Sequence, residues 1–487
     1  MKLPDSAQST GIAVTLVSRR RFLAFAVVAA SAGSLLAACQ SAAPAAPANP
    51  TTAAAAPAKP TTAPAAGGAA GATAAPGTTG ASALKGTKLT ILAGNSYVPA
   101  QDGLLDNMVQ QLNADTGMQA TIERYADAQL GTKVASVVES GGADLAVVAD
   151  TDAYLYANKL LDVTDIANEL DKTWGGWYDV AKQACIINGQ WKALMIGQAP
   201  AAWNWRTDMF KAVGLDTFPD TFDDLLVAAQ KLYDKGTPIG MTLGHAGGDG
   251  KSTNYPVLWA FGGKEFEADS KTLTINSPQT LAAVNWYVKA FKFMDPAVLG
   301  WLDPDNNQAF LAGKCSATVN VNTIYLAART AATEKGDANM KNIVANMDHA
   351  NWPSGPAGRF GNYNLNLWVA FADSQNHDGQ RAFLRTYFDK KFLVPWAKTG
   401  QSYFIPNFKG IDNEDAWPDD PKLKIFRELN KINRLPGWAG PPTPQVAQAV
   451  SSFLIVDMFA KAVTGQLTAE DAVAWAENEY KQILAKG

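Results

Sequence analysis

The feature that most constrains the fold is an alternation of strand and helix patterns near residues 88–150. Apolar runs typical of strands occupy three segments: 88–94 (KLTILAG), 119–126 (QATIERYA) and 143–150 (ADLAVVAD). Between the first two, apolar residues recur at helical spacing until Gly117: Leu104, Leu105, Met108 and Leu112. A second, short helix fits residues 132–140. Strands and helices that alternate in short units pack as a parallel or mixed sheet covered by helices, so the sequence predicts an α/β fold.

Polar residues follow the first and third predicted strands. Asn95 and Ser96 come directly after the first strand, and Asp150 and Asp152 come at the end of the third. In sheets of this kind, ligands meet the loops beyond the carboxyl ends of the strands. The alternative for each residue is ordinary turn or helix-cap chemistry. We therefore treat these four side chains as candidate ligand-binding positions.

The later part of the chain is rich in tryptophan and asparagine. About 400 residues lie from Lys85 onward, which is too many for one ordinary core and enough for two lobes. All fourteen tryptophans lie at or beyond Trp174. Many must be core residues, but several stand in loop-like contexts, in WNWRTD, YPVLWAFGG and RLPGWAGPP. An indole stacks on the C–H face of a pyranose, and amides bond its hydroxyls, so this composition favours a neutral polyhydroxylated ligand.

The first 84 residues have the composition of an export signal and a tether. An apolar run at 22–38 follows SRRRFL, which resembles a twin-arginine export motif with Arg19 and Arg20 as the pair. The run ends in LAAC, which resembles a bacterial lipobox with Cys39 as the lipid-attachment residue. An N-terminal membrane helix with an incidental cysteine is the alternative. Residues 39–84 are almost entirely Ala, Pro, Thr, Gly and Ser, which predicts a lipid-anchored, disordered tether after removal of residues 1–38.

Several classes of function are disfavoured by the composition. The net charge is −4 and no basic run exists outside the signal, so nothing suits nucleic acid. The three histidines have no metal-ligand spacing, and neither a metal site nor a cofactor is expected. Cys185 and Cys315 could pair after export, but two buried free thiols are favoured, because the twin-arginine route carries proteins folded in a reducing compartment.

Six segments, in order, resemble the extracellular solute-binding proteins of ABC importers, of the sugar-binding type related to maltose-binding protein. These segments are ADLAVVADTDAYLYANKLLDVTD, NGQWKALMIGQAPAAWNWRTDMFKAVGLDTFPDTFDDLLVAAQKL, FGGKEFEADSKTLTINSP, AFLAGKCSATVNVN, GPAGRFGNYNLNLWVAFADSQN and AVTGQLTAEDAVAWAENEYKQIL. The resemblance covers essentially all of residues 88–487. It implies a two-lobed periplasmic-binding-protein-like fold with a ligand cleft at the hinge, no enzymatic activity, and ABC permease subunits as partners.

The resemblance also implies boundaries and ligand-facing positions. The first lobe would comprise 85–199 plus 363–432 and the second 200–362 plus 433–487, with crossings near 198–203, 360–364 and 430–437. The protein would be a monomer, anchored by lipid at the outer face of the cytoplasmic membrane. Beyond the four residues above, the ligand-facing positions would be Gln198, Trp259, Asn322, Asn362, Tyr363, Tyr403 and Trp438. Trp203 and Trp205 fit packing as well as binding, whereas Trp286, Trp368 and Trp475 fit the core.

The sequence departs from the family pattern at places that bear on the ligand. The family commonly has proline where Met195 stands and a tyrosine–asparagine pair where Trp205 and Arg206 stand, and a carboxylate is replaced near Gln198. Two alternatives stay open: the same fold binding a polyamine, phosphorylated polyol or metal complex, and a surface-anchored glycoside hydrolase. The second needs two carboxylates at fixed separation, and the chain contains no GxSxG, HExxH or Walker motif.

Overall fold

The computed structural model describes residues 84–486. The predicted export signal, Cys39 and nearly all of the predicted tether lie outside the described residues. The described chain forms two lobes, each with its own sheet and its own apolar core. The α/β class predicted from the sequence is confirmed.

The first lobe contains a five-stranded sheet in the order β2-β1-β3-β12-β6. Its strands are β1 (Lys88–Gly94), β2 (Gln119–Tyr125), β3 (Leu145–Ala149), β6 (Leu194–Gln198) and β12 (Leu365–Ala370). β1 pairs in parallel with β2 and β3, while β12 runs antiparallel to β3 and β6. The carboxyl ends of β1, β3 and β6 therefore share one edge with the amino end of β12. This edge is where the candidate polar loops are found.

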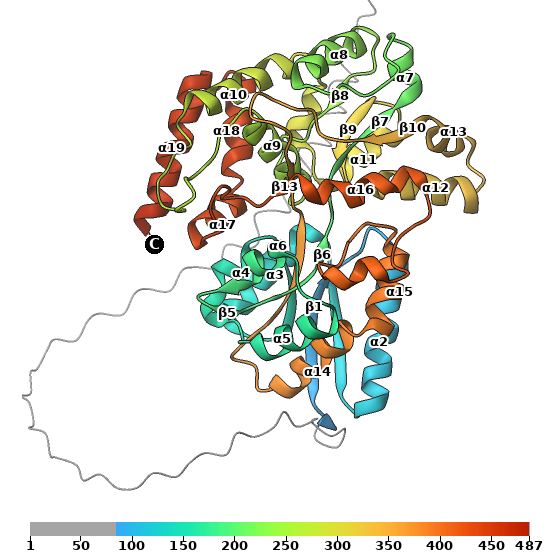
Figure 1. Cartoon of the computed structure of the whole chain (residues 1–487), viewed down its shortest axis with the longest axis vertical. Helices are drawn as coiled ribbons and strands as arrows, with labels where there is room; N and C mark the ends of the chain where they lie inside the picture. The colour runs from blue at the N-terminus through green and yellow to red at the C-terminus, as the bar shows by residue number, and fades with distance from the viewer. Residues whose placement is uncertain (1–83, 487) are drawn as a thin grey trace, which may run out of the picture. The chain divides into compact units, whose positions relative to one another are not determined.

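Helices pack around this sheet (Figure 1). They are α2 (Pro99–Thr116), α3 (Asp127–Ser140), α4 (Asp152–Leu155), η3 (Ala157–Lys159), α5 (Thr164–Thr173), α6 (Asp179–Cys185), α14 (His377–Tyr387), α15 (Lys390–Gly400) and η5 (Lys409–Asn413), with a hairpin of β4 (Ile186–Ile187) and β5 (Gln190–Trp191). α2 ends where the sequence predicted: Gly117 takes the left-handed conformation at φ 75°, which glycine adopts without strain. The first core draws mainly on residues 84–199 and 365–416.

The second lobe contains a four-stranded sheet in the order β10-β7-β9-β8. Its strands are β7 (Ala202–Arg206), β8 (Ile239–Gly240), β9 (Ala317–Asn320) and β10 (Met347–Ala350). β7 is antiparallel to β9 and β10, and β8 is parallel to β9. The amino end of β7 thus shares an edge with the carboxyl ends of β8 and β9.

The helices of the second lobe include the chain's last elements (Figure 1). They are α7 (Thr207–Lys211), α8 (Phe222–Asp234), α9 (Asp249–Ala260), α10 (Pro278–Phe291), η4 (Pro296–Gly300), α11 (Asp303–Leu311), α12 (Thr323–Glu334), α13 (Ala338–Asn346), η6 (Pro421–Leu423), α16 (Lys424–Glu428), η7 (Leu429–Lys431), α17 (Pro444–Ser451), α18 (Leu454–Val463) and α19 (Ala469–Lys486). The hydroxyl of Thr221 accepts from the backbone N–H of Asp224 at 3.1 Å and so caps α8. The second core draws mainly on residues 201–352 and 423–480.

The chain crosses between the cores more than once. Only residues 199–201 separate β6 from β7, and a two-residue parallel pair joins β11 (Gly361–Asn362) to β13 (Asn433–Arg434). Leu423, Phe426 and Leu429 pack in the second core. The sequence-based division, which placed residues up to 432 in the first lobe, is wrong for this stretch, because these apolar side chains are buried in the second core and Phe426 packs on His349 of β10.

No single helix among residues 84–486 is long and apolar enough to cross a membrane. The pair α17 and α18 passes the same length-and-composition criterion jointly but bends by 43° at its break. Its apolar side chains, including Val446, Ile455 and Phe459, are buried in the second core.

Candidate ligand-binding site

A cavity of about 790 Å³ is lined by residues of both lobes. This volume falls in the range of roughly 300–1,000 Å³ that is usual for small-molecule sites. The first lobe contributes the loops after β1 and β3, and the second contributes the segment 245–251 that leads into α9. A Cβ atom placed on Gly248 would lie 3.1 Å from the side-chain nitrogen of Asn364, so the two walls approach each other closely here.

The loop after β1 forms one part of the first wall. The backbone N–H of Asn95 donates to the carbonyl of Tyr125 at 3.0 Å, which holds the loop against β2. The backbone N–H of Ser96 donates to Asp102 at 3.0 Å, and its hydroxyl donates to Gln101 at 3.2 Å. These bonds tie the loop to the first turn of α2. Asn95 is exposed. Asn95 and Ser96, both predicted to contact the ligand, line the cavity.

Asp150 ties the end of β3 to the second lobe. Its residue takes φ 42°, a left-handed conformation that aspartate tolerates better than most residues. One carboxylate oxygen accepts from the backbone N–H of Leu365 at 2.7 Å, and the other forms an ion pair with the ammonium of Lys251 on α9. Asp150 is 1% exposed and Lys251 is 8% exposed. The pair is therefore a buried charge contact between the two walls.

The charges around Lys251 shift one another's protonation. Burial lowers the pKa of Lys251, but the carboxylates of Asp150, Asp152 and Asp303 raise it by more, so the net direction is upward. Asp152, which begins α4 and lines the cavity, has a pKa raised to about 6 by burial and by Asp150, although Lys251 lowers it. Lys251 is thus held charged, and Asp152 titrates close to neutral pH.

The second wall carries a further pair of carboxyl groups. One oxygen of Asp303 accepts from the backbone N–H groups of Gly248 and Asp249 at 3.0 and 2.8 Å, which fixes the start of α9. Asp249 is 8% exposed, and burial together with the nearby Asp303 raises its pKa well above the ordinary value. Both residues line the cavity.

Aromatic rings stand at the cavity from both lobes. Tyr97 and Tyr403 of the first lobe pack edge to face, with ring centroids 6.3 Å apart and planes at 77°. In the second lobe, His245 stacks on Phe453 with centroids 4.5 Å apart and planes at 4°. All four line the cavity, so each lobe presents aromatic rings to it.

Four of the eleven predicted ligand positions line this cavity, and Asp150 lies directly behind its wall. The four are Asn95, Ser96, Asp152 and Tyr403. The assignment of any of them to a ligand stays a prediction.

Gln198 and Asn322, which were predicted to face the ligand, hydrogen-bond other segments of the chain. Gln198 is 2% exposed at the end of β6, and its side chain donates to Asn407 at 3.4 Å. Asn322 is fully buried before α12 and donates to the carbonyl of Gln401, which belongs to the other lobe. Neither lines the cavity, although Asn322 borders residues that do.

Asn362 and Tyr363 lie at the β11–β13 crossing. The side chain of Asn362 is buried and donates to the carbonyl of Tyr363 at 2.7 Å. The Tyr363 hydroxyl donates to the carbonyl of Asn430 at 3.1 Å. The bond of the Tyr363 hydroxyl ties the crossing to η7, and neither residue lines the cavity.

The two tryptophans predicted to face the ligand pack against each other. Trp259 is fully buried on α9, and its ring lies 6.4 Å from that of Trp438 at 67°. Trp438 also packs on Phe360 at 5.2 Å, with the guanidinium of Arg434 5.9 Å from its ring. Neither tryptophan lines the cavity. Trp203, Trp205, Trp286 and Trp368 are buried in the cores as well.

Sequence reasoning missed the residues that the second lobe brings to the cavity. The main ones are Lys251, Asp249, Asp303 and Asn320. A usable signal existed for the first two, because they lie in the glycine-rich run GHAGGDGKST, and glycines allow close approach of another segment. Nothing in the sequence alone places Asp303 beside that run.

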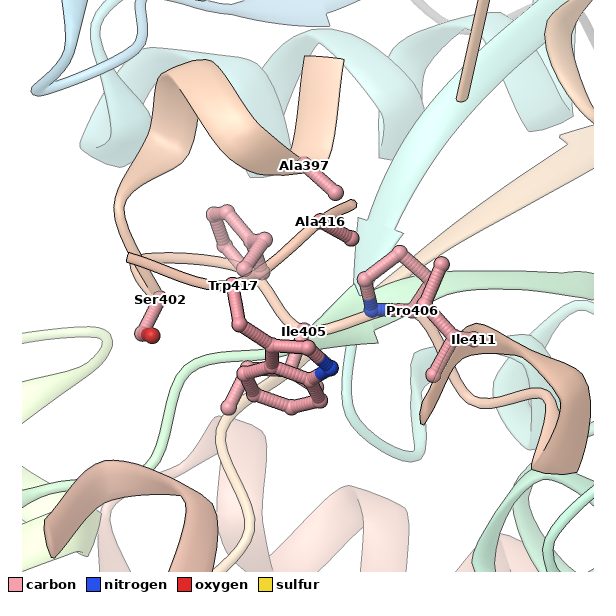
Figure 2. A pocket seen from close by; sticks show the side chains of 8 residues that line it. Ala397, Ser402, Ile405, Pro406, Ile411, Ala416 and Trp417 are labelled. Atoms are coloured by element: carbon pink, nitrogen blue, oxygen red, sulfur yellow. The ribbon is translucent and has the colours of Figure 1, made fainter. Parts of the chain in front are cut away.

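A separate pocket of about 10 Å³ lies in the first lobe, lined by Ala397, Ser402, Phe404, Ile405, Pro406, Ile411, Ala416 and Trp417. Figure 2 shows mostly apolar side chains around it, among them Pro406, Ile411 and the indole of Trp417. Its volume is that of about one water molecule, so it is too small for a solute.

Two further features bear on chemistry. Among residues 84–486, no group of three or more His, Cys, Asp or Glu side chains is arranged to hold a metal ion. Cys185 and Cys315 are buried free thiols in different cores, which is the alternative that the sequence favoured.

We compared the chain with proteins of known structure and sequence. Several solved structures share the fold. A sugar transporter of Arthrobacter chlorophenolicus A6, with bound laminaribiose, is 15% identical, with a TM-score of 0.70 over 81% of this chain and 99% of that one. Maltose-bound MalE3 of T. maritima is 19% identical, with a TM-score of 0.68 over 82% of this chain and 100% of that one.

Sequence comparison agrees with the structural one. A protein of Brucella abortus (strain 2308) that is named as a binding protein is 23% identical over 280 residues, which are 55% of this chain and 64% of that protein. The match thus spans less than two thirds of that relative. Residues 107–425 match the family described as bacterial extracellular solute-binding protein. With most of its length matched, the chain belongs to the bacterial extracellular solute-binding proteins.

Proposed function

We propose that this protein captures a sugar or oligosaccharide in the cavity between its lobes and delivers it to the permease of an ABC importer. The observation that carries the proposal is the cavity itself, whose walls come from both lobes and combine aromatic rings with amides and carboxyls. Such side chains suit a ligand with C–H faces and many hydroxyls. The bound sugars of the structurally similar proteins support the same class of ligand.

The mechanism we propose is hinge closure without a covalent step. Contacts from both walls would offset the cost of ordering the lobes around the ligand, and the permease would distinguish the closed form from the open one. The Asp150–Lys251 pair is a contact that closes as the walls meet. The short crossings at 199–201 and β11–β13 are the proposed hinges.

Two alternatives differ in what they require. The same fold could hold a non-sugar solute, such as a polyamine, a phosphorylated polyol or a metal complex. A glycoside hydrolase would need a carboxyl pair that acts on a glycosidic bond. Membership in a family of binding proteins supports the reading without catalysis.

A thermal-shift screen tests the proposal. The protein would be heated with a carbohydrate library and with spermidine, a phosphorylated polyol and a metal–chelate complex. Binding to the native state raises the melting temperature by mass action. Shifts from sugars alone support the proposal, and shifts from non-sugar solutes alone overturn it. Product formation from an oligosaccharide would instead support the hydrolase.

We further propose that the mature protein is a monomer attached through Cys39 to the outer face of the cytoplasmic membrane. The support is the order SRRRFL, apolar run, LAAC and Ala/Pro-rich segment. The Cys39→Ala variant, expressed in the native host, should leave the membrane fraction. A variant that still sediments with membranes would contradict the anchor. For the lobes we propose 85–199 plus 363–416 and 200–362 plus 423–487.

A further inference from the structure

Carboxyl groups outnumber cationic groups where the two walls meet. Asp150 and Asp152 come from the first lobe, and Asp249 and Asp303 come from the second. Lys251 is the cation among them. Four carboxyl groups around one ammonium leave the cluster short of positive charge.

The positive charge of Lys251 is neutralised by the carboxylate of Asp150. Their ion pair is buried, and the second oxygen of Asp150 is held by a backbone N–H. The partner of Lys251 therefore lies behind the wall rather than in the cavity. Asp152, Asp249 and Asp303 do line the cavity. Lys251 stabilises their negative charge less than that of Asp150, its direct partner.

The remaining carboxyls differ in how well the protein satisfies them. Asp303 accepts two backbone N–H groups with one oxygen. Asp249 is more than nine-tenths buried; the side chain of Asn306 bonds its carboxyl group, but its Oδ2 has no hydrogen-bond partner within the described part of the chain. A buried carboxyl oxygen left without a donor is costly, so a donor from a ligand would stabilise it.

The other charged side chains that line the cavity cannot supply the missing charge. Arg124 is held by Asp102 at 2.9 Å and by Asp106 at 2.6 Å. The ring of His245 bonds to Asp457 at 2.7 Å. Each of these cationic or titratable groups already faces a carboxylate of its own.

We propose that the solute is a sugar that carries a cationic amine, and that its ammonium group lies among Asp152, Asp249 and Asp303. This inference rests on the proposed sugar-binding function and narrows its substrate class. The amides and rings of the cavity would contact the sugar's hydroxyls and C–H faces, while the acidic cluster selects its charge. Anionic sugars, such as uronates and sugar phosphates, are excluded by repulsion.

The pKa shifts of the carboxyl groups in this cluster agree with this assignment. Burial, and in each case a neighbouring carboxylate, raises the pKa of Asp152 to about 6 and that of Asp249 well above its ordinary value. A nearby positive charge stabilises the ionised form of such a carboxyl group and favours loss of its proton. A ligand ammonium would take the place of those protons.

Matched sugars test the charge preference directly. Glucose, galactose, mannose and cellobiose would each be compared with the aminated counterpart and with the corresponding uronate or carboxylated form, at about pH 7 where amines are charged. We expect an aminated member to bind at least about tenfold more tightly than its neutral counterpart, and uronates not to bind.

The outcomes separate this inference from the function on which it rests. A neutral or carboxylated sugar that binds as tightly as its aminated counterpart overturns the inference and leaves sugar binding intact. Binding of spermidine without any sugar overturns the sugar-binding function, and the inference with it. So does a failure of every sugar to bind.

Variants locate the cation. Asp152→Asn and Asp249→Asn keep the side-chain shape but cannot ionise, and each should lower the ratio of aminated to neutral affinity by about tenfold. Asp415→Asn is the matched control, because this aspartate is 80% exposed and lies outside the cavity. An unchanged ratio in both folded cavity variants overturns the placement.

Proton release gives a readout that needs no variant. Calorimetry in buffers of different ionisation enthalpy, near the pKa of Asp152 at about 6, should show about half a proton or more released per aminated sugar bound. The neutral counterpart should release clearly less. Equal release by the two sugars would contradict the inference even if Asp249→Asn failed to fold.

Discussion

The two walls of the cavity carry acidic residues in different ways. Behind the first wall, the Asp150 carboxylate accepts a hydrogen bond from the backbone N–H of Leu365 and is neutralised by Lys251 of α9. On the second wall, Asp249 and Asp303 lie next to each other with backbone donors for Asp303 but no cation of their own. The lysine of the second wall thus balances the first wall rather than its own.

This difference shows how charge can couple two lobes. Because Lys251 of the second lobe pairs with Asp150 of the first, it stabilises the approach of the two walls. The carboxyl groups of the second wall are then left without a cation that neutralises them. Separating the walls would expose Lys251 and Asp150 to water and relieve the deficit around Asp249. Contact between the walls and the charge of the ligand are therefore linked through one side chain.

Removing that side chain should have the largest effect. Lys251→Ala leaves the Asp150 carboxylate buried without its partner, which typically costs about 3–5 kcal/mol in the free energy of unfolding. Urea denaturation followed by tryptophan fluorescence measures it.

Lys481→Ala is the control for this experiment. Lys481 pairs with Glu477 at 2.7 Å, but its side chain is 58% exposed. Exposed pairs contribute about 0–1 kcal/mol, so this variant should resemble the wild type. If both lysine substitutions lowered the free energy of unfolding equally, the buried Lys251–Asp150 pair would contribute no more to stability than an exposed pair.

Trp438→Ala examines a residue that lies away from both walls. Its partly buried ring packs on Trp259 and Phe360, so truncation should lower the free energy of unfolding by about 2–3 kcal/mol. Ligand affinity in the folded variant should change less than about threefold, because Trp438 lines no part of the cavity.

The contrary result would restore the sequence-based hypothesis. A folded Trp438→Ala protein with normal stability and an affinity weakened by about 1–3 kcal/mol would place this ring on the ligand. Phe360→Ala provides the comparison, because it removes the packing partner and leaves the indole in place.

The sequence predicted the first wall better than the second. β1, α2 and the positions of Asn95, Ser96 and Asp152 follow from local apolar periodicity and from the rule that loops after parallel strands share an edge. These features depend on residues close together in the chain. Periodicity and turn chemistry are enough to place them.

The second wall depends on contacts between distant segments. Asp303 reaches Gly248 and Asp249 only because α11 packs near the start of α9, and no local pattern reports that. Trp259 was misplaced for a related reason: its neighbours YPVL and FGG resemble a loop, but the segment is helical and its whole face is buried. Burial is set by what packs on a segment, and one sequence does not show this.

The pH dependence of stability should sharpen the comparison between the walls. The folded-state pKa of Asp152 is raised from 3.8 to about 6, so its stabilising contribution is full below about pH 4 and is lost as the pH rises through 6. Between these limits the wild type should lose on the order of 1–2 kcal/mol relative to Asp152→Asn, allowing for partial exposure. Denaturation curves of both proteins over this range measure the difference, and parallel curves would contradict it.

The smallest effect should come from the rim of the second wall. His245 bonds to Asp457 at 2.7 Å and stacks on Phe453, but its side chain is 55% exposed. Water competes for an exposed polar contact and weakens it, so His245→Ala should lower the free energy of unfolding by less than about 1 kcal/mol. Asp457→Asn should have a similarly small effect, and the double variant should show a coupling of at most about 0.5 kcal/mol. A loss of several kcal/mol would mean that the rim is as tightly coupled as Lys251 and Asp150, and that burial is not what separates strong from weak charge contacts around this cavity.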